Sequence, residues 1–284
     1  MIPAAFDYVR TSSLAQAIDL LQRDPETTMV VAGGHTLVPT LKLRLATPAL
    51  LVDIRGVEEL RGIRIDENGI RIGALTTHAE LLASEPLHKE LPIFRQAANL
   101  IADPQVRNRG TIGGSLANAD PAADWPAVVI ALDAELDIAH SGGFRHVAAR
   151  DFFVDIFTTA LEPTEILAGI HIPRPAAGTR LAYRKIRHPA SGYAVVGVAA
   201  ALRLDGDVVA QASIGVTGAA NRAFPGNVAA EFLIGKSLSL EVAAEAARLL
   251  SEATECLSDR YAPAEYRASL LATETRRALL ALAE

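Results

Sequence analysis

The sequence predicts an α+β protein with two domains, and three observations support that prediction. Short apolar strands alternate with amphipathic helices in the first half of the chain. The segment from Pro173 to Thr179 is rich in proline, glycine and alanine, as domain edges often are. Beyond it, two long strand-like runs precede two long helical patterns, an order typical of α+β folds. The length of 284 residues fits one large domain or two ordinary ones, and with half of the residues hydrophobic a full-sized core is possible.

The first elements are a helix and two buried strands. Ser13 opens a capping-box pattern, so we expect a helix to begin there. Apolar residues then recur at helical spacing, at Leu14, Ala17, Ile18 and Leu21. The apolar runs Met29–Ala32 and Leu50–Ile54 are short enough to be buried strands.

A hairpin and two helices follow. The runs Ile63–Ile65 and Ile70–Ile72 flank an Asn-Gly pair, which is a strong hairpin signal. Thr77 starts a second capping-box pattern, and Pro92–Leu100 has the composition of a further helix.

The middle of the chain carries a buried helix and more strands. Trp125–Leu132 is apolar on all sides, which predicts a buried helix, and Glu135–Ala139 is expected to be a strand. Val195–Leu204 and Val208–Val216 are strand-like runs joined by an Asp-Gly-Asp turn. We expect helices over Ser239–Cys256 and over Pro263–Leu282.

Charge and cysteine content exclude several classes of protein. The formal net charge is −6 and no stripe of lysine and arginine is present, so a nucleic-acid-binding role is not expected. The longest apolar run, Ala127–Leu132, is too short for a membrane span, and no signal peptide is visible, so a cytoplasmic protein is expected. The single cysteine, Cys256, lies in a helical pattern and cannot build an iron–sulfur cluster or a cysteine-rich zinc site alone.

Two glycine-rich turns indicate a phosphorylated ligand. The first is Ala32–Thr36, directly after a predicted strand, and the second is Thr111–Ser115. Glycine lets a ligand approach the backbone closely, and consecutive N–H groups in such a turn form an anion site. Either turn alone could be only a turn, but two of them favour a ligand held at both ends of its phosphate group. That ligand would be a dinucleotide.

Charged residues near the second turn allow two interpretations. Asp120 and Asp124 can accept hydrogen bonds from ribose hydroxyls, or they can cap the next helix. Asp120 precedes a proline in a turn-like pair, so we favour Asp124 as the ligand contact. Arg107 and Arg109 could pair with phosphate, but surface or ion-pair roles are the more common ones for such arginines.

Six longer sequence strings carry a specific resemblance to a known family. The strings V-A-G-G-H-T-L-V-P-T-L-K-L-R, R-I-G-A-L-T-T-H-A-E-L and N-R-G-T-I-G-G-S-L-A-N-A-D-P-A-A-D resemble the FAD-binding medium subunit of molybdenum hydroxylases, the carbon monoxide dehydrogenase and xanthine dehydrogenase family. E-I-L-A-G-I-H-I-P, A-Y-R-K-I-R-H-P-A-S-G-Y-A-V-V-G-V-A and Y-A-P-A-E-Y-R-A-S-L-L extend the resemblance over nearly the whole chain.

The resemblance implies a fold and a set of cofactor contacts. It implies an FAD-binding domain of the vanillyl-alcohol-oxidase (PCMH) type over residues 1–175, with subdomains at roughly 1–55 and 56–175. A smaller α+β C-terminal domain, an antiparallel sheet plus helices, would cover residues 180–284. The residues implied to contact FAD are Ala32, Gly33, Gly34, His35, Thr36, Thr111, Ile112, Gly113, Gly114, Ser115, Asp124, Leu167, Lys185 and Tyr193.

The resemblance also implies an oxidoreductase role and partners. In this family a large subunit carries the molybdenum cofactor and a small subunit carries [2Fe–2S] clusters. Electrons would pass from those clusters through FAD to an external acceptor such as a quinone, NAD or oxygen. No residue of this chain is expected to be catalytic towards the organic substrate or to bind a metal. The alternatives are a self-sufficient flavin oxidase or dehydrogenase and a flavin-free scaffold subunit.

Several histidines have plain structural interpretations. His78 follows two threonines and is expected to be a helix-start or hydrogen-bonded structural residue. His140 and His146 flank a Ser-Gly-Gly turn and are interpreted as surface residues of a hairpin. The seven histidines show no metal-binding spacing.

Overall fold

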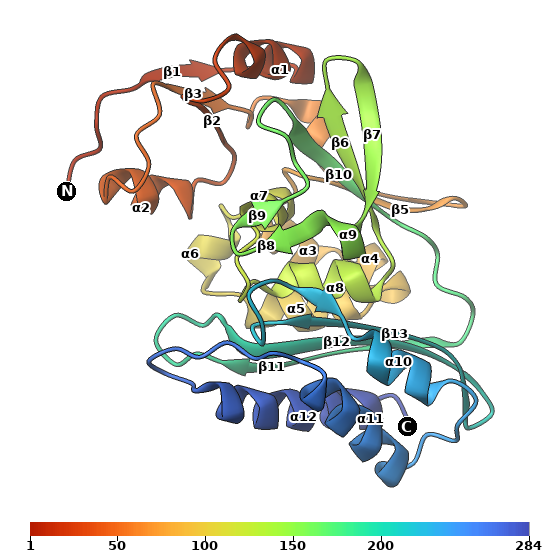
Figure 1. Cartoon of the computed structure of the whole chain (residues 1–284). Helices are drawn as coiled ribbons and strands as arrows, with labels where there is room; N and C mark the ends of the chain where they lie inside the picture. Colours follow the sequence, from red (N-terminus) through yellow and green to blue (C-terminus); the bar gives the residue numbers. More distant parts are fainter. Residues whose placement is uncertain (284) are drawn as a thin grey trace.

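The computed structural model describes residues 1–283 of the chain (Figure 1). The chain forms one small parallel sheet, two larger antiparallel sheets and a two-stranded ribbon. Helices pack between and below the two larger sheets (Figure 1). The predicted α+β class with two domains is therefore confirmed.

The N-terminal unit is a parallel sheet with β3 in its centre. Its elements are β1 (Asp7–Arg10), α1 (Leu14–Arg23), β2 (Thr28–Val31), α2 (Leu37–Lys42) and β3 (Leu50–Asp53), and the strand order is β1-β3-β2. Helix α1 buries the four apolar residues that the helical spacing predicted. As expected, the helix begins after Ser13, whose side chain accepts a hydrogen bond from the backbone of Gln16.

The central unit is built on a five-stranded antiparallel sheet in the order β4-β5-β10-β6-β7. Its strands are β4 (Ile63–Asp66), β5 (Gly69–Gly73), β6 (Glu135–His140), β7 (Gly143–Ala148) and β10 (Ile166–Ile172). Both predicted hairpins of this unit are confirmed, including the one that carries His140 and His146.

Short helices cover the central sheet and fill the space beside it. They are η1 (Glu58–Leu60), α3 (His78–Ala83), α4 (Glu85–Glu90), α5 (Ile93–Leu100), α6 (Pro104–Arg107), α7 (Ile112–Asn118), α8 (Asp124–Ala131) and α9 (Ala149–Phe152), with the ribbon β8 (Phe153–Asp155) and β9 (Thr158–Thr159). The capping box at Thr77 is present with both of its hydrogen bonds.

The C-terminal unit is a four-stranded antiparallel sheet backed by helices. The strands are β11 (Thr179–Arg187), β12 (Ala194–Asp205), β13 (Val208–Thr217) and β14 (Phe224–Pro225). The helices are α10 (Asn227–Leu233), α11 (Leu240–Glu252) and α12 (Ala264–Leu280). Figure 1 shows α11 and α12 below this sheet and α5 and α8 above it, so the sheet is covered on both faces.

Helix α8 joins the central and C-terminal units. All eight of its residues are buried, because it packs against α5 and against strands β12 and β13. Trp125 in its first turn is fully buried and its ring lies 5.3 Å from that of Phe94. A helix that is apolar on every side is stable only where it is buried on every side, as α8 is between these units.

The structure corrects two local expectations. Thr111–Ser115 is not a free turn, because Thr111 is the N-cap of α7 and the glycines lie in the first turn of that helix. Cys256 is not helical, since α11 ends at Glu252 and the following residues form an extended connection. There the half-buried thiol packs against the C-terminal core.

Candidate functional site

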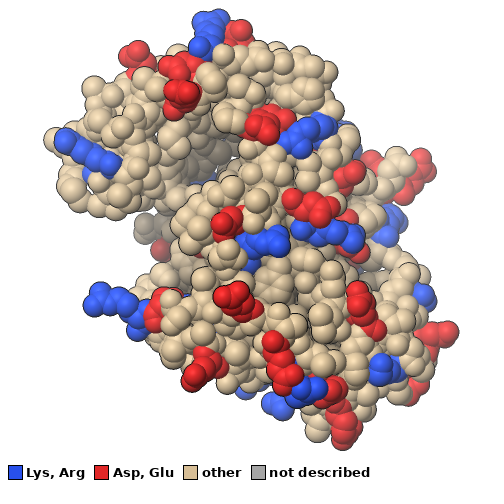
Figure 2. Space-filling model, viewed as in Figure 1, with Lys and Arg blue, Asp and Glu red and all other residues tan. Residues whose placement is uncertain are grey.

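A cavity of about 600 Å³ lies where the N-terminal unit meets the central unit. Its size falls within the range of small-molecule and cofactor sites. The space-filling view shows a recess between the upper-left lobe, formed by the N-terminal unit, and the rest of the molecule (Figure 2). The walls come from both glycine-rich segments, from α3, α6 and β10, and from the loop that carries Tyr193.

The first glycine-rich segment, Ala32–Thr36, connects β2 to α2 at one wall of the cavity. The backbone N–H groups of these five residues have no acceptor among residues 1–283. Gly34 adopts a φ of +77°, a conformation that residues with a Cβ rarely adopt. The segment is therefore a run of free donors at the cavity wall, which suits an anionic group.

Gly33 brings the first segment against the residues that precede the second. A Cβ on Gly33 would overlap the carbonyl oxygen of Arg109 and lie 3.0 Å from the Cα of Gly110. Only a glycine allows the two backbones to approach this closely. This contact places both glycine-rich segments on one cavity.

The second segment, Thr111–Ser115, offers its side chains more than its backbone. Ile112 and Gly113 donate their N–H groups to the carbonyls of Thr76 and Ala74. Gly114 donates to the Thr111 hydroxyl oxygen at 3.1 Å, as in an N-cap. The Thr111 hydroxyl hydrogen and the Ser115 side chain remain for a ligand, together with the positive end of a short helix.

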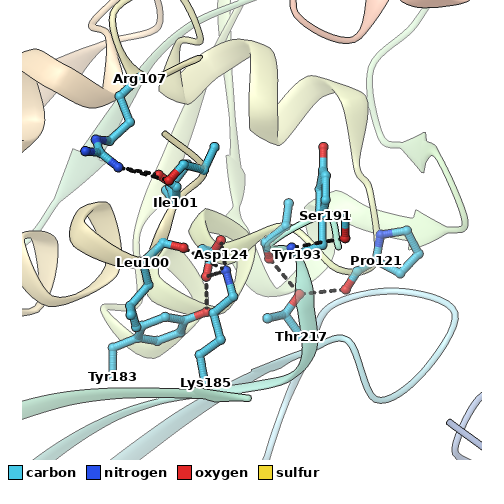
Figure 3. A network of polar contacts seen from close by, with 12 residues as sticks. Leu100, Ile101, Arg107, Pro121, Asp124, Tyr183, Lys185, Ser191, Tyr193 and Thr217 are labelled. Carbon is cyan, nitrogen blue, oxygen red and sulfur yellow. Dashed lines mark hydrogen bonds and ion pairs between the residues drawn. The ribbon is translucent and has the colours of Figure 1, made fainter. Parts of the chain in front are cut away.

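Asp124, which lines the cavity, forms a buried polar cluster with Lys185 and Tyr183 (Figure 3). The Tyr183 hydroxyl donates to Asp124 Oδ1 at 2.6 Å, and Lys185 Nζ donates to Asp124 Oδ2 at 2.8 Å and to the Leu100 carbonyl at 3.2 Å. Burial raises the pKa of Asp124 and lowers the pKa of Lys185, while each partner favours the charged form of the other. The pair is thus held together by mutual charge and hydrogen bonding in a place where neither charge is solvated.

The Tyr193 loop closes one side of the cavity. Its turn is held by His188, whose Nδ1 accepts the N–H groups of Ala190 and Ser191, and whose ring lies 4.4 Å from that of Tyr261. Tyr193 is 42% exposed, and burial of its hydroxyl raises its pKa, with Asp120 and Asp124 adding to the effect. An aromatic ring held at a cavity rim in this way can stack on a planar ligand.

The structure brings most of the predicted contact residues together. The cavity is lined by Ala32, Gly33, Gly34, His35, Thr36, Thr111, Gly113, Gly114, Ser115, Asp124, Leu167 and Tyr193. Ile112 instead packs into the core, and the Lys185 side chain is fully buried behind Asp124. Asp120 also borders the cavity, but its carboxylate accepts the N–H of Ala122 in a turn.

Tyr183 is a site residue that the sequence analysis missed, and the structure also shows what Arg107 and His78 contact. Tyr183 lies two residues before Lys185 on β11, so both side chains point to one face of that strand, and this spacing is a signal that could have found it. Arg107 does not face a phosphate site freely, because it donates to the carbonyls of Ile101 and Ala102. His78 accepts a hydrogen bond from Trp125, as its structural interpretation predicted, and it also lines the cavity.

The cavity suits a ligand with a phosphate group and an apolar planar part. Free backbone donors and hydroxyls lie at the glycine-rich segments, and apolar walls come from Ile101, Leu161 and Leu167. Within residues 1–283, no cluster of three or more metal-ligating side chains is found. None of the helices in the described part of the chain has both the length and the apolar character of a membrane span.

Comparisons with known proteins agree with this geometry. Residues 4–175 match the family model of the FAD binding domain in molybdopterin dehydrogenase, and residues 181–282 match that of the CO dehydrogenase flavoprotein C-terminal domain. The chain is 42% identical to the carbon monoxide dehydrogenase medium chain of Afipia carboxidovorans, over 98% of this chain and 97% of the relative. It is 37% identical to subunit alpha of the 6-hydroxypseudooxynicotine dehydrogenase complex of Paenarthrobacter nicotinovorans, over 98% and 95%.

A solved structure shares the whole fold. The carbon monoxide dehydrogenase of Hydrogenophaga pseudoflava that lacks the Mo-pyranopterin moiety of its cofactor superposes with a TM-score of 0.96 at 38% identity. The match covers 99% of this chain and 98% of the other chain.

Proposed function

The chain belongs to the family of FAD-binding subunits of molybdenum hydroxylases, and from this premise we propose which of its residues hold the cofactor. It is an FAD-binding electron-transfer subunit of a heteromeric oxidoreductase, and molybdenum and iron–sulfur centres belong to other subunits. FAD supplies the redox chemistry when bound, accepting electrons and passing them on. The residues of this chain bind it, orient it and shield it.

The first glycine-rich segment would hold the pyrophosphate of FAD. This assignment rests on the single most telling observation at the site, which is the row of N–H groups from Ala32 to Thr36 that lack an acceptor among the described residues. A pyrophosphate supplies several acceptor oxygens to such a row. The backbone of His35 would contribute in this way whatever its ring does.

The second segment would bind the same group from the other side. Thr111 and Ser115 would donate their hydroxyl hydrogens to phosphate oxygens, at the start of α7. Gly113 and Gly114 would let that helix start lie close to its neighbours, since a Cβ on Gly113 would meet the Ala74 carbonyl oxygen at 2.7 Å.

Asp124 would accept a hydrogen bond from a hydroxyl group of the cofactor. A carboxylate offers about four acceptor positions, and Tyr183 and Lys185 leave part of them free. Lys185 would act on FAD through Asp124, by keeping that carboxylate charged and oriented. Leu167 and Tyr193 would contact the apolar and planar parts of the cofactor.

Family membership supports a proposal about the partner subunits and the electron acceptor. We propose that the chain associates with an iron–sulfur small subunit and a molybdenum-binding large subunit, and that a quinone, NAD or oxygen takes the electrons. The one cysteine supports cluster-bearing partners, because [2Fe–2S] clusters need several thiolate ligands. A cytoplasmic location stays a prediction.

We propose an FAD-binding domain over residues 1–175, divided at about residue 55, and a C-terminal domain over residues 180–284. The separate sheets of residues 7–53, 63–172 and 179–225 support this division.

A visible absorption spectrum of the purified complex that contains the full chain tests the function. We expect flavin bands at about one FAD per chain, and flavin reduction by the organic substrate only when the partner subunits are present. A complex without flavin, or an isolated chain whose flavin is reduced directly by substrate, would contradict the proposal.

A further inference from the structure

His78 is a second kind of donor at the cavity, and its protonation is fixed by the fold. It is the first residue of α3, and the residue as a whole is only 6% exposed. Trp125 Nε1 donates a hydrogen bond to His78 Nδ1 at 3.0 Å. Because an indole N–H can only donate, Nδ1 must be the acceptor and the ring hydrogen must lie on Nε2.

The imidazole stays neutral at physiological pH. Burial, with smaller contributions from the nearby His35 and Arg107, lowers the pKa of His78 to about 4. At neutral pH, a ring with one fixed tautomer therefore keeps one N–H donor.

The Nε2 atom lies beside the backbone that leads into the second glycine-rich segment. A Cβ placed on Gly110 would be 2.8 Å from His78 Nε2, and both residues border the cavity. Gly110 directly precedes Thr111, and its carbonyl accepts the backbone N–H of His78. The fold thus ties the ring to the segment that we assign to the phosphate.

His78 Nε2 has no hydrogen-bond partner among residues 1–283, whereas the other ring nitrogen is satisfied. The atom is open to the cavity rather than enclosed, since the fully buried side-chain atoms that lack a partner in the described residues are Arg267 Nε and Thr275 Oγ1. An N–H donor that faces the cavity can reach an acceptor on a ligand there. Arg107, which is positively charged, and His35, which is polar, lie near enough to His78 to influence its pKa. Their presence favours an anionic acceptor over a neutral one.

We propose that His78 donates its Nε2 hydrogen to a phosphate oxygen of bound FAD, as a third contact besides the two glycine-rich segments. The inference rests on the FAD-binding function proposed above. It extends the structural interpretation of His78, in which the ring only accepts from Trp125 and packs on Gly110.

Two substitutions separate the donor role from the structural one. His78→Asn keeps an acceptor near the position of Nδ1 for Trp125 but has no donor at the position of Nε2. His78→Gln places an amide donor near the position of Nε2 but loses the acceptor at Nδ1. The donor role therefore predicts weaker FAD binding for the asparagine variant, and the structural role predicts the larger loss for the glutamine variant.

The affinity test uses the assembled complex, from which FAD is removed and then titrated back. We expect His78→Asn to bind FAD about 10- to 100-fold more weakly than wild type, and His78→Gln to lose clearly less. Equal affinities in wild type and His78→Asn would overturn the inference, as would a larger loss in His78→Gln. A wild-type complex that binds no FAD would instead refute the proposed function.

A second measurement needs no change at His78. With ¹⁵N-labelled histidine in the full chain, solid-state NMR of the FAD-loaded complex detects dipolar coupling between a histidine nitrogen and ³¹P. His35 and His78 are the histidines that line the cavity within the described residues. Coupling that persists in His35→Asn supports the inference, and its absence in that variant overturns it.

Discussion

The two glycine-rich segments look alike in sequence but differ in what their backbones have left to offer. The N–H groups of Ala32–Thr36 have no acceptor among the described residues, so the first segment is a row of free donors. The second segment, Thr111–Ser115, forms the start of α7, and its N–H groups after Thr111 are bonded within the chain. The first segment therefore binds mainly through its backbone, and the second mainly through its hydroxyls and its helix.

The glycines of the two segments are needed for different structural reasons. Gly34 is needed for its φ of +77°, and Gly33 for a close approach to Arg109. Gly113 is needed because α7 starts against Ala74, and a side chain there would displace the helix. Gly34 thus shapes the backbone of the segment whose N–H groups are free, whereas Gly33 and Gly113 allow close packing. The variants below test that division, from the largest expected effect to the smallest.

The largest effect is expected at Asp124, on the packed side of the site. Asp124→Asn leaves the Lys185 ammonium group buried without its counter-charge, so we expect the free energy of unfolding to fall by about 3–5 kcal/mol. Urea unfolding monitored by circular dichroism measures it. The matched control is Asp124→Asn combined with Lys185→Met, which should recover most of the loss. If Asp124→Asn alone were as stable as wild type, the ion pair between Asp124 and Lys185 would not contribute to stability.

Gly33→Ala tests the contact between the two segments. The new Cβ would overlap the backbone of Arg109, so we expect a loss of about 2–3 kcal/mol of stability and FAD binding weaker by about 100-fold. FAD titration and urea unfolding measure the two effects. Gly142→Ala is the control, because Gly142, like Gly33, does not have a positive φ, and its new Cβ would meet only the side chain of His140, at 3.0 Å. If both variants retain FAD like wild type, the close approach is not needed for binding.

The dependence of stability on acid pH tests the role of Asp53, in the N-terminal unit that also carries the first glycine-rich segment. Burial opposes ionisation of Asp53, but hydrogen bonds from Arg55 and Tyr8 outweigh it and lower the pKa of Asp53 to about 2. A carboxyl whose pKa is lower in the folded state stabilises the fold above its unfolded pKa, and this stability is lost as the pH falls through the folded value. We expect wild type to lose about 2 kcal/mol from this group between pH 4 and pH 2.

The comparison for that experiment is Asp53→Asn, which lacks the titrating group. Its stability should be lower at neutral pH and should change less between pH 4 and pH 2, by urea unfolding at each pH. Parallel curves for the two proteins over that range would refute the assignment.

The smallest effect on stability is expected from removing the threonine hydroxyl of each segment, at Thr111 and at Thr36. Thr111 caps α7 through its side chain, whereas Thr36 makes no side-chain cap to α2. We expect Thr111→Val to reduce stability by about 1 kcal/mol and Thr36→Val to leave it within about 0.5 kcal/mol of wild type. Thermal unfolding of the FAD-free proteins measures the difference. Equal losses would mean that the two segments are not structurally distinct.

Local patterns in the sequence predicted much of the fold. The spacing of Leu14, Ala17, Ile18 and Leu21 gave the buried face of α1, and the Asn-Gly and Asp-Gly turns gave two hairpins. The short helix α2 and the strands β1 and β11 were not predicted from local pattern. They owe their form to tertiary pairing, as when β1 joins β3 across more than forty residues in register from Asp7 with Leu50.

The candidate site was predictable in its composition but not in its chemistry. The sequence marked both glycine-rich segments and Asp124, and the structure places them on one cavity. The sequence could not show that the N–H groups of Ile112 and Gly113 are already used, because their acceptors, Thr76 and Ala74, lie far away along the chain. For the same reason the Trp125 hydrogen bond that fixes the tautomer of His78 was not visible in the sequence.

Hydrogen–deuterium exchange of the assembled complex, with and without FAD, tests the difference between the two segments most directly. Free N–H groups gain acceptors when a ligand binds, whereas N–H groups that are already bonded change little. We predict strong new protection of peptides that cover residues 32–36 and little change over residues 112–115 once the flavin spectrum shows that FAD is bound. Protection confined to residues 112–115, or none at residues 32–36, would contradict the account.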